Sequence, residues 1–143
     1  MKKILFLCTG NYYRSRFAEY LFNFLAEKQG INWRAFSRGL AIERGVNNIG
    51  AISPYAREAL KVRGCIISEN ERLPLQAKEK DFAEADQIIA LNESEHRPLI
   101  RERFPNWEDV IKYWQINDIN KTPVEEALSD IEQQVKRLIS ILR

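Results

Sequence analysis

Apolar residues along this chain follow two alternating patterns: short unbroken runs, and longer stretches with helical spacing. The short runs have the length and the aliphatic or aromatic content of strands, and they cover residues 4–7, 33–36, 87–91 and 110–114. The helical spacing covers residues 15–29, 55–63, 94–104 and 124–142. Strands that alternate with helices predict an α/β fold. We expect a three-layer sandwich with a four-stranded parallel sheet flanked by helices on both faces.

Start and stop signals bound most of the predicted helices. Gly30 and Gly64 follow the ends of the first two helices, where glycine commonly terminates a helix. Ser53, before a proline, and Ser94 stand where the second and third helices begin, so both are expected caps. Thr122 opens a capping box with proline in the next position, which predicts the start of the last helix.

Two segments carry neither a strand nor a helix pattern. Residues 37–52 form a long loop with three glycines, and long loops in compact domains are often functional. Residues 68–80 are mixed and polar, and they predict no more than a helical turn.

The loop between the first strand and the first helix has the clearest chemistry. Cys8 ends the strand, Arg14 begins the helix, and five residues separate them. Backbone N–H groups in such a loop can form an anion-binding nest beside the positive end of the helix. This field favours the reactive thiolate, and one guanidinium can bind two phosphoryl oxygens. Ser15, the expected helix cap, can donate to the sulfur or to the loop. The spacing indicates a nucleophile beneath a phosphate site, with a structural core cysteine as the alternative.

The composition is that of an ordinary globular protein. The chain has 143 residues, 45% hydrophobic and 29% charged, which fits a single domain over residues 1–143. The net charge of +2 is small, and the basic residues are scattered, so we expect no nucleic acid partner. No run approaches the ~20 apolar residues that span a membrane, and two cysteines fit a reducing compartment. We therefore expect a cytoplasmic protein that does not bind membranes. We also expect it to be a monomer or a weak dimer.

The first twenty residues resemble the signature of the low-molecular-weight protein tyrosine phosphatase family. The resemblance rests on Cys8-Thr9-Gly10-Asn11, followed by Arg14-Ser15 and Ala18-Glu19. It implies that Cys8 is the nucleophile, that Arg14 is the phosphate clamp, and that Ser15 stabilises the thiolate. The substrate-binding residues that it implies are Thr9, Gly10, Asn11, Tyr12, Tyr13 and Ser15. It also implies the four-stranded α/β sandwich that the hydrophobic pattern predicts.

Displacement of an alcohol from phosphorus requires a proton donor for the leaving oxygen. The single histidine, His96, falls in the first turn of a predicted helix between charged residues, so we expect it to be solvated. A carboxyl group at the same end of the sheet as Cys8 is therefore the expected acid. Asp118, four residues past the fourth strand, lies at that end, with Glu93 as its rival. The family has an Asp-Pro pair in this loop, and the chain resembles it with Ile119 in place of the proline.

The chain departs from the family pattern at several positions. Tyr13 stands where many members have a second cysteine that protects the nucleophile from overoxidation, and Arg16 stands where proline is common. Ser37 resembles a serine that braces the phosphate loop, but Arg38 follows it in place of a small residue. Cys65 comes after a helix, and we interpret it as a structural thiol.

We predict a cysteine-dependent phosphatase that hydrolyses phosphate monoesters through a phosphocysteine intermediate. The expected substrate is a phosphorylated protein, in the first place phosphotyrosine, or a small phosphate monoester. Two alternatives stay open: a single-cysteine arsenate reductase that uses an external thiol, and a catalytically weak module that binds phosphate or phosphopeptides. We expect no cofactor and no metal site, because the sequence offers no metal-ligand cluster with usable spacing.

Overall fold

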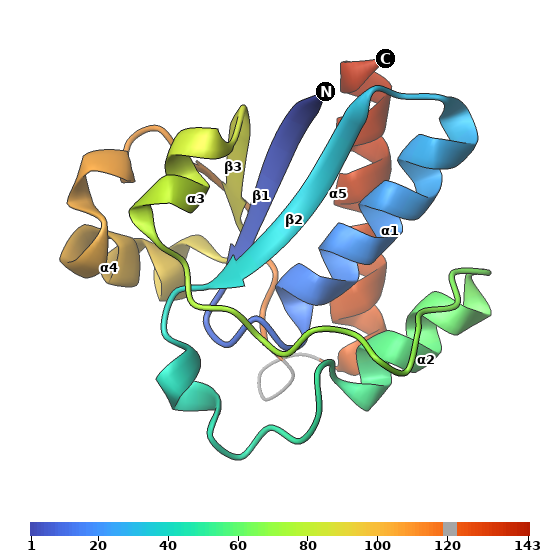
Figure 1. The fold of residues 1–143 in the computed structure, drawn as a ribbon, viewed down its shortest axis with the longest axis horizontal. Helices are drawn as coiled ribbons and strands as arrows, with labels where there is room; N and C mark the ends of the chain where they lie inside the picture. The colour runs from blue at the N-terminus through green and yellow to red at the C-terminus, as the bar shows by residue number, and fades with distance from the viewer. Residues whose placement is uncertain (119–122) are drawn as a thin grey trace.

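A four-stranded parallel sheet forms the centre of the computed structural model, which describes residues 1–118 and 123–143 (Figure 1). The strands are β1 (Lys2–Cys8), β2 (Trp33–Gly39), β3 (Gln87–Ala90) and β4 (Lys112–Tyr113). Their order across the sheet is β2-β1-β3-β4, and every neighbouring pair is parallel. In this register Cys8 pairs with Gly39 and Leu7 with Ala90, so the carboxyl ends of three strands meet at one edge. The predicted fold class is confirmed.

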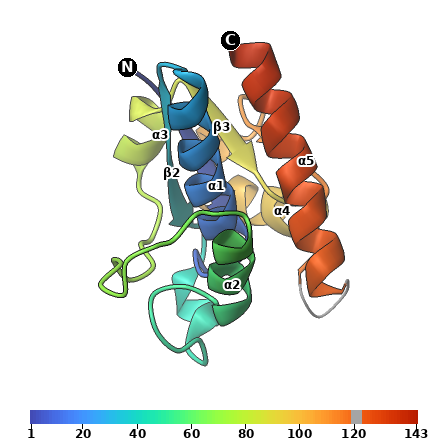
Figure 2. The same cartoon turned by 90° about the vertical axis from the view of Figure 1, so that its right-hand side faces the viewer.

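Helices cover both faces of the sheet, as the hydrophobic pattern predicts (Figures 1 and 2). The helices are α1 (Arg14–Gln29), α2 (Pro54–Val62), α3 (Glu79–Glu84), α4 (Glu93–Arg103) and α5 (Val124–Leu142), with short 3-10 turns at Ile42–Gly45 and Pro105–Trp107. α1, α2 and α5 lie on one face, and α3 and α4 lie on the other. Among the described residues, no helix is both long and apolar enough to cross a membrane.

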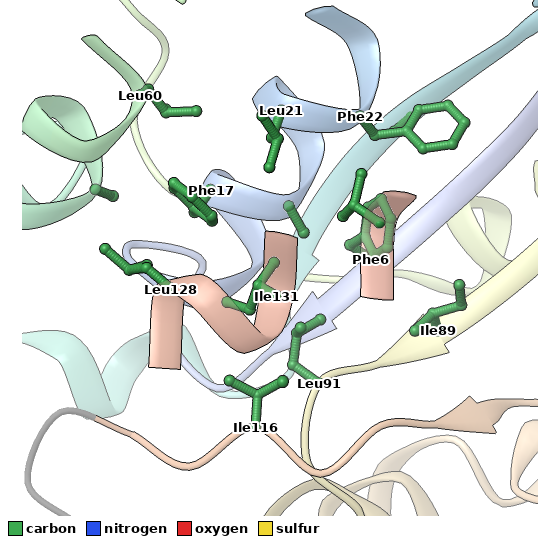
Figure 3. Packing of buried hydrophobic residues seen from close by; sticks show 14 of the residues in the cluster. Phe6, Phe17, Leu21, Phe22, Leu60, Ile89, Leu91, Ile116, Leu128 and Ile131 are labelled. Atoms are coloured by element: carbon green, nitrogen blue, oxygen red, sulfur yellow. The ribbon is translucent and has the colours of Figure 1, made fainter. Parts of the chain in front are cut away.

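β1 is an inner strand of the sheet, and from Ile4 to Cys8 its side chains are buried on both faces. Ile4 and Phe6 pack with α1, α2 and α5 in one core cluster, whereas Leu5 and Leu7 pack toward α3 and α4 in a second cluster. Figure 3 shows Phe6 between the helices and the neighbouring strand that carries Ile89. Because β1 is buried up to Cys8, the end of the strand has a fixed position in the sheet, and so does the start of the loop that follows.

Most of the expected start and stop signals are present in the structure. Gly30 ends α1 in the left-handed conformation with φ of 68°, and Ser53 accepts a hydrogen bond from the N–H of Tyr55 at 3.2 Å. Ser94 is not the cap of α4. Asn92 caps it instead, because its side chain accepts from the N–H of Glu95 at 3.0 Å. The expected cap Thr122 lies outside the described residues.

The structure differs from the sequence-based expectations at four further points. β2 runs three residues further than expected, to Gly39. It pairs with β1 along its full length, and its last residue, Gly39, is opposite Cys8. β4 is shorter than expected and contains only Lys112–Tyr113. The helix α3 was not predicted from the polar segment before β3. Ser15 lies inside the first turn of α1 and is not its cap, since Tyr13 precedes the helix.

Candidate active site

A pocket of about 380 Å³ opens at the carboxyl edge of the sheet, around the loop between β1 and α1. The predicted site residues that line it are Cys8, Thr9, Gly10, Tyr12, Tyr13, Arg14 and Asp118. The opposite wall comes from the long loop before α2 and from its first turn, with Arg44, Asn48 and Tyr55 among its residues. This is the position where parallel α/β sheets hold their ligands.

Cys8 lies at the floor of this pocket, 3% exposed, at the end of β1. Its Sγ is 3.0 Å from Oγ of Ser15. The Ser15 oxygen already accepts a hydrogen bond from Nδ2 of Asn11 at 2.8 Å. The hydroxyl hydrogen of Ser15 is therefore available to the sulfur, and it can stabilise a thiolate.

Asn11 holds the loop in shape through a fully used side-chain amide. Its Nδ2 donates to Ser15 and, at 2.9 Å, to Oγ of Ser37. Its Oδ1 accepts from Nη1 of Arg72 at 2.9 Å and from the N–H of Leu75 at 3.1 Å. Asn11 has a φ of 51°, a conformation that asparagine tolerates better than most residues. The bracing serine expected from the family resemblance is thus in contact with the loop.

The backbone of this loop leaves donors for an anion. Within the described part of the chain, the N–H groups of residues 9–13 donate to no acceptor. Loop amides in this state, next to the N-terminus of a long helix, are able to bind an anion.

Arg14 is 2% exposed, and carboxylates surround its guanidinium. Its Nη1 and Nη2 donate to Oε1 and Oε2 of Glu95 at 3.1 Å and 2.6 Å, and Nη1 also donates to the carbonyl of Ile116 at 3.1 Å. Oδ2 of Asp118 is 3.5 Å from Nη2. Burial alone would lower the pKa of Arg14, but the bond to Glu95 and the charges of Cys8, Glu95 and Asp118 raise it above its ordinary value.

Glu95 was not predicted as a site residue. Besides Arg14, its Oε2 accepts from Oγ1 of Thr9 at 2.6 Å and lies 3.2 Å from Nε2 of His96. Burial opposes its ionisation, yet the interactions with His96, Arg14 and Thr9 hold the pKa of Glu95 far below its usual range. The sequence did contain a signal for Glu95. It lies in the first turn of the helix that follows β3, and β3 pairs with β1, so this turn starts at the same edge of the sheet as Cys8.

The expectation that His96 is solvated was wrong, because its side chain is 0% exposed. α4 begins at its Asn92 cap, two residues before the expected cap, and His96 shares an inward face with Leu99 and Ile100. Nδ1 of His96 accepts from the N–H of Asn92 at 3.0 Å, so the neutral ring carries its proton on Nε2. Burial lowers the pKa of His96 below its ordinary value.

The structure separates the two candidate acids. Asp118 lines the pocket and lies beside Arg14, with its side chain 39% exposed. Glu93 does not line the pocket, and its carboxylate pairs with Arg97 at 2.9 Å. Geometry therefore favours Asp118, whose assignment as the acid stays a prediction.

Tyr12 and Arg16 form hydrogen bonds that hold the long loop (residues 40–53) next to the pocket. The Tyr12 hydroxyl donates to the carbonyl of Ile49 at 2.7 Å. Arg16 is fully buried, and its Nη1 donates to the carbonyl of Ala51 at 3.1 Å. Tyr13 is 8% exposed, and burial together with the charge of Asp118 raises the pKa of its hydroxyl to about 12. The long loop before α2 is thus held beside the pocket by Tyr12, from the loop between β1 and α1, and by Arg16, from α1.

Comparisons with known proteins agree with this arrangement. A family model described as Low molecular weight phosphotyrosine protein phosphatase matches residues 3–142. The chain is 32% identical over 108 residues to a protein-arginine-phosphatase of Bacillus subtilis (strain 168), covering 76% of this chain and 67% of that protein. It is 36% identical over 104 residues to the low molecular weight phosphotyrosine protein phosphatase of Homo sapiens, covering 71% of this chain and 61% of that protein. The crystal structure of a low molecular weight protein tyrosine phosphatase from T. tengcongensis matches 99% of this chain and 100% of its own, with a TM-score of 0.81 and 25% identity.

Proposed function

Because this chain belongs to the low molecular weight phosphotyrosine protein phosphatase family, we propose that it hydrolyses phosphate monoesters with Cys8 as the nucleophile. The observation that carries this proposal is the position of the Cys8 sulfur. It lies in the pocket, 3.0 Å from Oγ of Ser15, at the start of a loop whose N–H groups donate to no acceptor among the described residues. A nucleophile in that position faces a bound phosphoryl group.

The reaction proceeds in two steps. In the first, the Cys8 thiolate forms a bond to phosphorus while the bond to the leaving oxygen breaks, and protonated Asp118 gives its proton to that oxygen. In the second, the Asp118 carboxylate takes a proton from a water molecule, whose oxygen bonds to phosphorus as the sulfur–phosphorus bond breaks. The products are inorganic phosphate and the regenerated thiolate. Loop amides and Arg14 balance the charge on the equatorial oxygens in both steps.

The expected substrate is a phosphorylated protein, with phosphotyrosine as the phosphorylated residue. Aromatic side chains suit an aryl ester, and Tyr12, Tyr13 and Tyr55 line the pocket. The name of the Bacillus subtilis relative favours phosphoarginine as a second candidate. Comparing kcat/KM for a phosphotyrosine peptide and a phosphoarginine peptide of the same sequence separates the two.

Hydrolysis of p-nitrophenyl phosphate tests the assignment of Cys8. We expect Cys8→Ser to lose turnover and to keep its affinity for inorganic phosphate, because a serine hydroxyl is a far weaker nucleophile in the same cradle. Cys65→Ser is the matched control: Cys65 does not line the pocket, and burial raises the pKa of its thiol. Full activity in Cys8→Ser would overturn the proposal.

The same variants separate the two alternative functions. An arsenate reductase with an external thiol would oxidise glutathione in an arsenate-dependent way that requires Cys8. A binding module would bind a phosphopeptide and show no hydrolysis by the intact protein.

We further propose a cytoplasmic location, where both cysteines, free in this structure, stay reduced.

A further inference from the structure

The first turn of α4 is hydrogen-bonded to both ends of the loop between β1 and α1, residues 9–14, which is called the anion loop below. Glu95 accepts from the Thr9 hydroxyl at the start of the loop and from two nitrogens of Arg14 at its end. The carbonyl of Ile116, on the segment that leads to Asp118, accepts from Nη1 of Arg14 and from Nδ2 of Asn92, each at 3.1 Å. A single carboxylate on α4 thus joins the start of the loop after β1 to the first residue of α1.

Glu95 occupies only one edge of the Arg14 guanidinium. A guanidinium offers five N–H donors in a planar fork, with one edge formed by Nη1 and Nη2 and another formed by Nε and Nη2. Glu95 and Ile116 take both hydrogens of Nη1 and one hydrogen of Nη2. The Nε–Nη2 edge carries two parallel donors, which is what bidentate binding of a phosphoryl group requires. Oδ2 of Asp118 lies 3.5 Å from Nη2 on the guanidinium, so the proposed acid stands next to the arginine.

We propose that Glu95 is a positioning residue, which holds Arg14 so that its Nε–Nη2 edge faces the anion above Cys8. The inference rests on the proposed phosphatase function, because the anion is the phosphoryl group of the substrate. Glu95 itself does not touch the reacting atoms. It also supplies a countercharge to an arginine that is 2% exposed, and a buried charge of this kind needs such a partner.

A second layer fixes the position of Glu95. Its N–H donates to the capping side chain of Asn92 at 3.0 Å, and the N–H of Asn92 donates in turn to Nδ1 of His96. Nε2 of His96 then lies 3.2 Å from Oε2 of Glu95. Because the backbone and the carboxylate are both held, Glu95 can transmit the position of α4 to Arg14.

A competing role for Glu95 makes the opposite prediction about phosphate affinity. A carboxylate that blocked Arg14 would release it when neutralised, and loss of a nearby negative charge would by itself tighten anion binding. A positioning carboxylate, when removed, leaves the guanidinium misplaced and weakens anion binding. The sign of the change therefore separates the two roles.

Calorimetric titration with inorganic phosphate provides this sign without requiring turnover. We expect Glu95→Gln to weaken phosphate binding by about tenfold, the equivalent of one charge-assisted hydrogen bond. Glu93→Gln is the matched control, since Glu93 lies in the same helical turn and pairs with Arg97; it should bind like the wild type. Glu95→Asp, which keeps the charge on a shorter side chain, should fall between the two and replaces Glu95→Gln if that variant does not fold.

A double-mutant cycle on kcat/KM for p-nitrophenyl phosphate shows whether Glu95 acts through Arg14. In an Arg14→Lys background, which lacks the planar fork, we expect Glu95→Gln to cause little further loss. Losses that simply add, or phosphate binding that is unchanged or tighter in Glu95→Gln, would overturn the inference. The phosphatase proposal stands or falls separately, on the Cys8→Ser result.

Discussion

At the scale of single residues, Asn11 connects the anion loop to three other parts of the chain. We expect Asn11→Ala to lower the free energy of unfolding by about 2–4 kcal/mol, because it removes four hydrogen bonds inside a buried site. Asn11→Gly is the control for the backbone. Glycine tolerates the φ of 51°, so it should recover about 1 kcal/mol relative to alanine. Urea denaturation measures both, and wild-type stability in Asn11→Ala would contradict this role.

The proposed role of Asp118 predicts a dependence on the leaving group. Asp118→Asn should lower kcat/KM, which reports the first step alone, by ~10²–10⁴-fold for phenyl phosphate, whose leaving oxygen needs a proton. The loss should be much smaller for 2,4-dinitrophenyl phosphate, because that leaving group departs as a stable anion. An equal loss for both substrates would contradict general acid catalysis by Asp118.

At the scale of elements, local sequence signals were sufficient where burial repeats with a regular period. The last helix was predicted from its apolar face, and Leu128, Ile131, Val135 and Leu138 of that face are buried in α5, whereas Val124 and Leu142 are partly buried against the same core. The first strand was predicted from a run that is buried on both sides. The cap of α4 was placed two residues too late, at Ser94 instead of Asn92, because either residue type can start a helix. The cap predicted at Ser15 was wrong because α1 starts after Tyr13, whose side chain makes no capping bond.

The segment before α3 could not be predicted, because contacts distant in sequence determine its path. Arg72 bonds to Asn11 and to the carbonyl of Ser37, and Nε2 of Gln76 donates to the carbonyl of Leu40 at 2.9 Å. These polar contacts leave no periodic pattern in the sequence. The segment nevertheless bonds to Asn11 in the loop between β1 and α1, so a support of the candidate site was missed together with the element.

α5 allows a paired test of its predicted core face. Ile131 is fully buried on the core face of α5 (Figure 3). The adjacent residue Asp130 is exposed. We expect Ile131→Ala to lower the free energy of unfolding by about 2–5 kcal/mol, through lost burial and the cavity left behind. Asp130→Ala should change it by less than about 0.5 kcal/mol. Similar values for both variants in chemical denaturation would contradict the assigned face.

At the scale of the whole molecule, the site is assembled from segments distant in sequence that meet at the carboxyl edge of the sheet. The parallel order of the strands made it possible to predict that Cys8 and Asp118 lie together. It did not reveal Glu95, or the burial of His96, because both depend on where α4 begins and how it packs. Sequence spacing thus identified the groups assigned to the chemistry, and tertiary structure was needed to identify the groups that hold them.

The buried His96 should make global stability depend on pH. Its native pKa is lowered, with Glu95, Arg14 and Asp118 as its charged neighbours, whereas an unfolded histidine titrates near pH 6.5. Below that pH the unfolded chain binds a proton that the native state excludes, so stability falls as pH falls, by up to about 1.4 kcal/mol per pH unit. Because the chain has one histidine, His96→Asn should remove this slope between about pH 5 and 6.5. An unchanged slope in urea denaturation would contradict it.

The most direct test of the proposed chemistry is to trap the covalent intermediate. Asp118→Ala lacks the group assigned to activate water, so after mixing with 2,4-dinitrophenyl phosphate and quenching in acid the phosphoryl enzyme should accumulate. Mass spectrometry of the digested protein should then place a phosphoryl group on the peptide that contains Cys8, and none in the Cys8→Ala, Asp118→Ala double variant. A phosphoryl group on any other residue, or hydrolysis that continues in Cys8→Ala, would contradict Cys8 as the nucleophile.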